Sequence, residues 1–157
     1  MVTLVDEGWS APRDDIGDGS YGYNGAEGVD FVKNLAIKTL DYCNGTLHLY
    51  PDLWGYNETW GSTWIQERDE VGKTHKKPVV LEEYGGPPEP AHHAAVERPW
   101  QTTVLRDTRL AMDQFWQFGT HFGDQLSSYY PHTIWYNATE YKQLVRDHAA
   151  AMLRKRI

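Results

Sequence analysis

The sequence predicts an α/β fold with a parallel sheet, and two observations support this prediction. Short runs rich in β-branched residues alternate with amphipathic stretches four times along the 157 residues, which is the pattern of βα units. Loops rich in glycine and proline separate these runs. A chain of this length is enough for one ordinary domain, so we expect residues 1–157 to form a single unit of four βα units.

The four strands are expected where apolar runs stop at a turn signal. One run ends at Pro51, and another ends where Gly85 and Gly86 precede two prolines, a sequence that cannot continue regular structure. The expected strands cover residues 2–7, 46–50, 78–83 and 112–118.

A helix is expected after each strand. Asp30 is suited to an N-cap and Pro99 to a first helical position. The last helix has an apolar stripe at helical spacing, formed by Tyr141, Leu144, Val145, His148 and Met152. The expected helices cover residues 30–40, 62–73, 99–110 and 139–155.

Four βα units are half of a (β/α)8 TIM barrel, whose usual size is roughly 250 residues. A doubly wound sheet uses the same units, but its glycine-rich phosphate loop is missing from this sequence. We therefore expect half of a barrel, with further βα units encoded upstream. Half a barrel leaves sheet edges open, so self-association through those edges is also expected.

Composition narrows the class of ligand. The net charge of -7 disfavours nucleic acid, because Lys and Arg supply most of the affinity for a phosphate backbone. No apolar run approaches the ~20 residues that a membrane span needs. Seven Trp and ten Tyr offer flat apolar faces with polar edges, a combination that suits sugar rings as well as a protein core.

Three N-x-[ST] sequons favour a secretory route, since they are acceptors for N-glycosylation. They begin at Asn44, Asn57 and Asn137. The first residues contain neither a basic region nor an apolar region of a signal peptide. The expectation is a secreted glycoprotein whose leader is not in this chain, with the lone Cys43 either a small buried residue or a partner for absent sequence.

Two strand ends carry side chains that could do chemistry. His48 and Tyr50 are two residues apart on the strand 46–50, so they face the same side and can share a pocket. On the strand 112–118, Trp116 could stack on a pyranose ring or simply pack.

The strand 78–83 ends in two adjacent carboxylates, Glu82 and Glu83, which are costly there unless partners or water reach them. Alternation puts Glu83 on the face of Val79 and Leu81. If that face is the barrel interior, Glu83 lies at the mouth and Glu82 turns towards the helices.

These residues resemble glycoside hydrolase family 5. Residues 83–85 are similar to the E-[FYW]-G strand end of that family, and residues 48–50 to its preceding H-x-Y strand. Three longer stretches, residues 34–37, 47–55 and 115–119, resemble the endo-β-1,4-mannanases of the family in order and spacing. The resemblance covers nearly the whole chain and identifies it as strands five to eight, the C-terminal half of the barrel.

The resemblance implies a retaining hydrolysis of β-1,4 links in mannan, without metal or cofactor, in which Glu83 is the nucleophile. Tyr50 would hydrogen-bond Glu83, and His48 would shape the same subsite. Trp116 would be the sugar platform at the cleavage point, and Trp54 would line a neighbouring subsite.

The sequence departs from the family pattern at the acid/base, which should lie in an Asn-Glu pair at a strand end. Its Asn57-Glu58 pair lies in a predicted loop, so the chain alone is expected to have little activity. Two alternatives stay open: a carbohydrate-binding or pseudoenzyme module without catalysis, and an endo-β-1,4-glucanase.

Overall fold

The computed structural model describes residues 1–45, 56–86, 90–127, 130 and 132–157. Its main sheet has four parallel strands in the order of the chain, β1-β2-β3-β4. They are β1 (Thr3–Asp6), β2 (Tyr42–Gly45), β3 (Val79–Leu81) and β4 (Met112–Asp113). The predicted succession of four βα units is confirmed.

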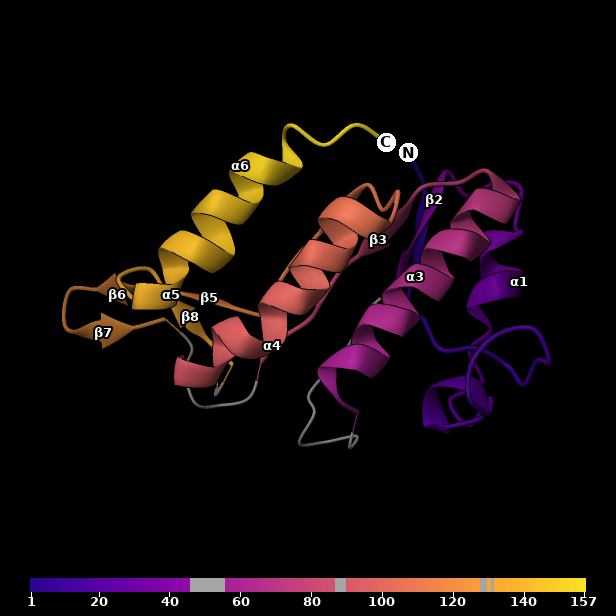
Figure 1. The fold of residues 1–157 in the computed structure, drawn as a ribbon, viewed down its shortest axis with the longest axis horizontal. Helices are drawn as coiled ribbons and strands as arrows, with labels where there is room; N and C mark the ends of the chain where they lie inside the picture. Colours follow the sequence, from indigo (N-terminus) through magenta and orange to yellow (C-terminus); the bar gives the residue numbers. More distant parts are fainter. Residues whose placement is uncertain (46–55, 87–89, 128–129, 131) are drawn as a thin grey trace.

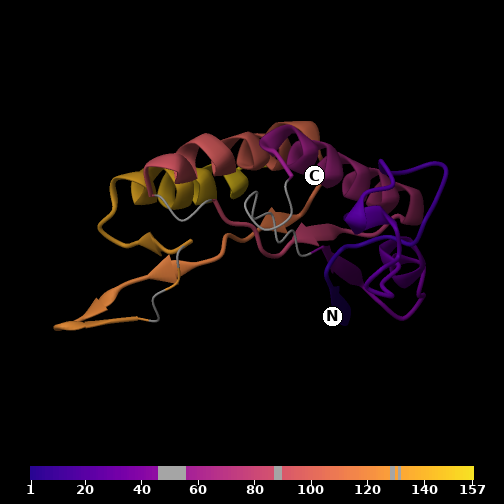
Figure 2. The ribbon, with the colours of Figure 1, turned by 90° about the horizontal axis from the view of Figure 1, so that it is seen from below.

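The long helices cover one face of this sheet. Figure 2 shows α3, α4 and α6 together along one side, with the strands beneath them. Parallel crossovers have a single hand, so a sheet whose strands follow chain order collects its helices on one face. A doubly wound sheet would have helices on both faces, whereas this one-sided arrangement is the one that barrels repeat.

The helices begin and end at recognisable signals. Helix α1 (Phe31–Leu35) is capped by Asp30, whose side chain accepts from the Lys33 amide, as predicted. Asn57 caps α3 (Glu58–His75) by accepting from the Trp60 amide at 2.8 Å. Helix α3 ends at Lys76, which adopts the left-handed conformation with φ 54°.

The third helix begins earlier than predicted. Helix α4 covers Pro90–Thr102 and continues as the π-helical segment η2, Thr103–Asp107. Pro99 therefore lies inside the helix rather than at its start. The first helical position is taken by Pro90, which satisfies the same preference for a residue without an amide hydrogen.

The C-terminal helix is one run in three parts; it begins at residue 139 as expected and ends at Met152 rather than at residue 155. It consists of α5 (Thr139–Tyr141), the π-helical η3 (Lys142–Asp147) and α6 (His148–Met152). Short elements complete the described fold: a 3-10 turn η1 (Tyr21–Tyr23), a parallel pair β5 (Phe118–Gly119) with β8 (Ile134–Trp135), and a hairpin of β6 (His121–Phe122) with β7 (Gln125–Leu126). The hairpin projects away from the helices (Figure 2).

Two predicted strands differ in extent. The strand expected at 46–50 lies outside the described residues, and the described second strand is Tyr42–Gly45 just before it. The strand expected at 112–118 pairs only at its two ends, in β4 and β5. Exposure nevertheless alternates from residue 111 to 118, with the even-numbered residues exposed, so the strand-like alternation holds throughout.

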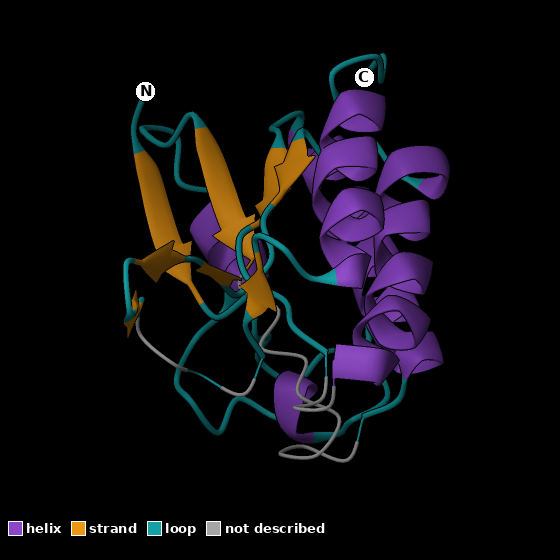
Figure 3. Ribbon diagram, turned by 90° about the vertical axis from the view of Figure 1, so that its left-hand side faces the viewer, coloured by secondary structure: helices purple, strands orange, loops and turns teal. Residues whose placement is uncertain are grey.

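The core lies between the sheet and its helices. Val79 and Leu81 of β3 point into it and are 3% and 1% exposed. Facing them are large buried side chains of the helices, among them Phe31, Leu35, Trp64, Ile65 and Trp100. Val5 of β1 and Met112 of β4 are 62% and 41% exposed, so the face of the sheet away from the helices is open (Figure 3).

Gly72 sets the distance between α3 and β3. A Cβ atom at this position would lie 2.8 Å from Val79 Cγ2 and 3.0 Å from the Lys77 carbonyl oxygen. We expect Gly72→Ala to lower the free energy of unfolding by about 1–3 kcal/mol, because overpacking forces the helix away from the sheet. Urea unfolding measures this, with the exposed Thr74→Ala as control; equal midpoints would contradict the tight packing.

Candidate active site

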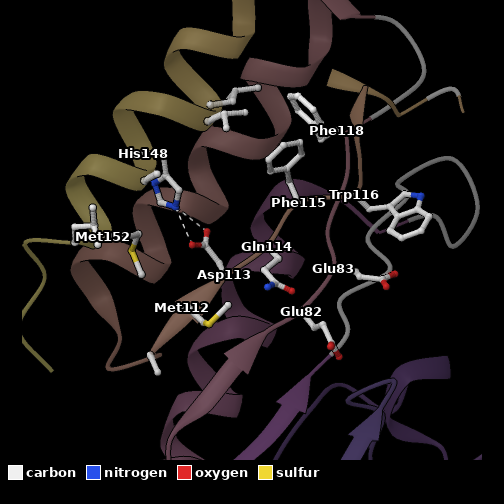
Figure 4. Close-up of a pocket in the computed structure, with 15 residues that line it drawn as sticks. Glu82, Glu83, Met112, Asp113, Gln114, Phe115, Trp116, Phe118, His148 and Met152 are labelled. Atoms are coloured by element: carbon white, nitrogen blue, oxygen red, sulfur yellow. Dashed lines mark hydrogen bonds and ion pairs between the residues drawn. The ribbon is translucent and has the colours of Figure 1, made fainter. Parts of the chain in front are cut away.

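A cavity of about 730 Å³ opens where β3 and β4 end. The segment after β3 contributes Glu82 and Glu83, and the stretch from Met112 to Trp116 forms the wall beside it. His148 and Met152 of α6 close the far end (Figure 4). In a parallel α/β fold the carboxyl ends of the strands are where functional side chains gather, so this cavity is the candidate active site.

The two faces of the strand 78–83 are reversed relative to the expectation that Val79 and Leu81 line a barrel interior. Val79 and Leu81 pack under the helices, whereas Val80 and Glu82 line a second cavity on the open face with Met112. The expectation that Glu82 turns towards the helices is therefore wrong. Strand β3 ends at Leu81, so the irregular segment that follows, and not the strand period, brings Glu83 into the cavity.

Trp116 lies in the same cavity as Glu83. Figure 4 shows the two side chains at the same end of the pocket. The Trp116 amide donates to the Tyr84 carbonyl oxygen at 2.7 Å, and the Trp116 side chain meets the Tyr130 ring edge-on at 6.5 Å. Trp116 is 38% exposed and lines the cavity, so its side chain is accessible to a ligand.

The remaining predicted site residues are not brought together by the described part of the structure. His48, Tyr50 and Trp54 all lie outside the described residues. Of the glycosylation candidates, Asn57 and Asn137 are exposed next to helix starts, and Asn44 lies in β2. Glycosylation at these positions stays a prediction.

Sequence reasoning missed a buried polar network behind the glutamates. Tyr84 donates its hydroxyl hydrogen to Asp113 Oδ2 at 3.0 Å, and His148 Nε2 lies 2.8 Å from the same oxygen. Gln101 Nε2 donates to the Tyr84 hydroxyl at 2.9 Å. The only hint in the sequence was the position of His148 on an otherwise apolar helix stripe.

A second buried acid, Glu97, supports the turn that follows Glu83. Its Oε1 accepts from the Gly86 amide at 2.9 Å, and its side chain has no exposed surface. Burial raises the pKa of Glu97 to about 8; the Gly86 hydrogen bond opposes this rise and the Glu140 carboxylate adds to it. On the other side of the turn, His132 Nδ1 contacts the Gly86 carbonyl oxygen.

The described residues contain no group of three or more His, Cys, Asp or Glu side chains that could hold a metal ion. Among the same residues, no helix combines the length and apolar character needed to cross a bilayer.

Comparison with known proteins gives no matching family model, but individual relatives are clear. The chain is 44% identical over 153 residues to mannan endo-1,4-beta-mannosidase A of Hypocrea jecorina, covering 97% of this chain and 33% of the relative. It is also 44% identical over 152 residues to the enzyme of the same name from Aspergillus aculeatus, covering 38% of it.

Solved structures agree with these relatives. The endo-1,4-beta-mannanase of Rhizomucor miehei matches with a TM-score of 0.82 and 32% identity, over 99% of this chain and 41% of that one. The endo-beta-1,4-mannanase of Thermotoga petrophila matches with a TM-score of 0.80 and 31% identity, over 94% of this chain and 34% of that one. The resemblance seen in the strand-end motifs is thus confirmed: this chain corresponds, along nearly all of its length, to one stretch of the endo-1,4-β-mannanases of glycoside hydrolase family 5 and spans between a third and two fifths of them.

Proposed function

We propose that this chain is the nucleophile-bearing, C-terminal half of a (β/α)8 barrel that hydrolyses internal β-1,4 links in mannan with retention. The observation that carries the proposal is Glu83 sharing a strand-end cavity with Trp116, in a chain 44% identical to mannan endo-1,4-beta-mannosidases. In this proposal residues 1–157 supply strands five to eight of one catalytic domain.

In the proposed reaction the Glu83 carboxylate attacks the anomeric carbon and the bond to the leaving oxygen breaks. A second carboxylic acid, about 5 Å from the first in retaining enzymes, gives its proton to that oxygen. The second carboxylate then takes a proton from water, whose oxygen attacks the anomeric carbon of the glycosyl ester and releases the Glu83 carboxylate. Trp116 offers its ring to the apolar face of the sugar bound at the cleavage point, and His48 and Tyr50 complete the subsite.

The second carboxylic acid is assigned to a residue outside this chain. Glu58, of the Asn57-Glu58 pair, is the first residue of α3 and does not end a strand. Asp113 lines the cavity, but His148 and Tyr84 both engage its carboxylate. The relatives are longer than this chain, and we infer that the acid/base belongs to the part of the barrel that these residues do not represent.

The open face of the sheet supports the proposal that this chain is one half of a barrel. Val5 and Met112 are exposed there, and both outer strands, β1 and β4, have a neighbour on one side only in the described sheet. Free edges of this kind favour pairing, so we expect the isolated 157-residue chain to self-associate. Sedimentation velocity measures this: a clean monomer at micromolar concentration would contradict the prediction.

The proposed partner is a polysaccharide, with mannan preferred over glucan. Secretion remains part of the proposal, because the sequon residues Asn57 and Asn137 are exposed.

For Trp116→Ala we expect mannooligosaccharide affinity to fall about tenfold, since stacking area is lost. Calorimetric titration tests this, with Trp116→Tyr as the variant that keeps a ring. Equal affinity of the alanine variant would remove Trp116 from the sugar platform.

The nucleophile itself can be tested without the missing acid. A dinitrophenyl β-mannoside with fluorine in place of the hydroxyl next to the anomeric carbon has a leaving group that departs as a stable anion and needs no proton. Attack by Glu83 forms an ester and releases dinitrophenolate with the bonding electron pair. We expect one fluoromannosyl group per chain by intact mass, mapped to Glu83 by peptide sequencing.

Saturable binding of mannooligosaccharide without any label would instead favour a carbohydrate-binding module and would overturn the catalytic proposal. Faster hydrolysis of carboxymethyl cellulose than of galactomannan, once the complete barrel is assembled, would favour a glucanase.

A further inference from the structure

Tyr84 directly follows Glu83 and is anchored deep in the protein. Its side chain is 1% exposed and meets the Trp100 ring edge-on at 6.2 Å. Its hydroxyl group donates to Asp113 Oδ2 at 3.0 Å and accepts from Gln101 Nε2 at 2.9 Å. Burial and the Asp113 carboxylate raise the pKa of Tyr84, so the hydroxyl keeps its proton and remains a donor.

Asp113 connects Tyr84 to the C-terminal helix. Its side chain is 2% exposed and that of His148 is 11% exposed. The Nε2 atom of His148 lies 2.9 Å from Oδ1 and 2.8 Å from Oδ2 of Asp113 (Figure 4). Gln101 Nε2 also donates to the Leu144 carbonyl oxygen at 2.8 Å, so β4, α4 and the C-terminal helix meet at one polar cluster.

The backbone of Tyr84 reaches the other proposed site residue. Its carbonyl oxygen accepts from the Trp116 amide at 2.7 Å. Tyr84 does not itself line the cavity. It nevertheless adjoins Glu83 in sequence and holds Trp116 by a hydrogen bond. A displacement of Tyr84 would move the nucleophile and the sugar platform together.

Joining helices to a sheet through a buried polar cluster costs desolvation free energy. Apolar side chains of similar volume often give equal stability, whereas hydrogen bonds fix directions as well as distances. The cluster can therefore hold a reactive carboxylate in a fixed position. Such precision matters, because a displacement of the reacting group by about 1 Å can lower the rate on the order of a hundredfold.

We propose that Tyr84, Asp113 and His148 are positioning residues, which hold Glu83 and Trp116 in one geometry by tying the turn after β3 to β4 and the C-terminal helix. This role rests on the proposed function of Glu83. None of the three needs to touch the sugar, and all act through the segment that carries the site.

The test compares Asp113→Asn with Asp69→Asn in the 157-residue chain. Asp69 is a matched control, since its side chain is 5% exposed and its Oδ1 accepts from the Arg109 amide at 2.7 Å, before the start of β4. We expect Asp113→Asn to speed hydrogen exchange of the Trp116 amide and to slow fluoromannosyl labelling of Glu83, each at least about tenfold. Asp69→Asn should leave both unchanged even where it lowers Tm.

Two substitutions of His148 differ in whether they keep a hydrogen-bond donor for Asp113. His148→Gln keeps a donor for Asp113 and should retain most of the labelling rate, while His148→Leu should lose it. A folded Asp113→Asn chain with exchange and labelling equal to wild type would overturn the positioning role. Failure of the wild type to label at all would count against Glu83 as nucleophile; the exchange of the Trp116 amide still decides whether the cluster holds this segment.

Discussion

Replacing Glu83 with Gln is expected to lower the rate of dinitrophenolate release from the activated mannoside at least about 10³-fold, or about 4 kcal/mol in the barrier. The amide keeps the size and the hydrogen-bonding shape of the carboxylate but is a very poor nucleophile. Because the leaving group needs no protonation, the loss reports on nucleophilic attack alone. Stopped-flow absorbance of the phenolate measures it.

The neighbouring carboxylate is the matched control for this experiment. Glu82 lines the same cavity and also the second one on the open face of the sheet. We expect Glu82→Gln to change the rate less than about tenfold, an effect of the local charge at most. The reverse pattern, with Glu82→Gln inactive and Glu83→Gln active, would assign the attack to Glu82 and sink the proposal.

The second large effect is a dependence of the free energy of unfolding on pH, caused by Glu97. Burial raises the pKa of Glu97 from its usual 4.5 to about 8. The folded chain then keeps a proton that the unfolded chain has lost, so the free energy of unfolding should fall as pH rises from 4.5 to about 8. The full shift corresponds to on the order of 5 kcal/mol as an upper limit.

Glu97→Gln should remove this dependence, because a glutamine resembles the protonated acid and can still accept from the Gly86 amide. We expect the variant and the wild type to have similar unfolding free energies near pH 5, and the variant to be the more stable near pH 8. Urea unfolding at several pH values measures the difference. A difference that does not change with pH would show that Glu97 is ionised in the folded chain.

The succession of strands and helices was predictable because its signals are local. Capping by Asp30 and the turn after β3 depend on side chains a few residues apart, and amphipathic spacing within a segment marks the face it buries. The same reasoning misplaced the start of α4, since Pro90 and Pro99 both satisfy the preference for proline at a first helical position. Which of them begins the helix depends on how α4 packs.

By itself, the sequence determined the order of the βα units and the strand-end motif that contains Glu83, because neighbouring residues encode periodicity and turns. Only the tertiary structure decided which way Glu82 faces and what holds Tyr84. Asp113 and His148 are 35 residues apart, and Gln101 and Leu144 are 43 apart. Contacts of that kind depend on how the helices pack on the sheet, and no local pattern in the chain specifies them.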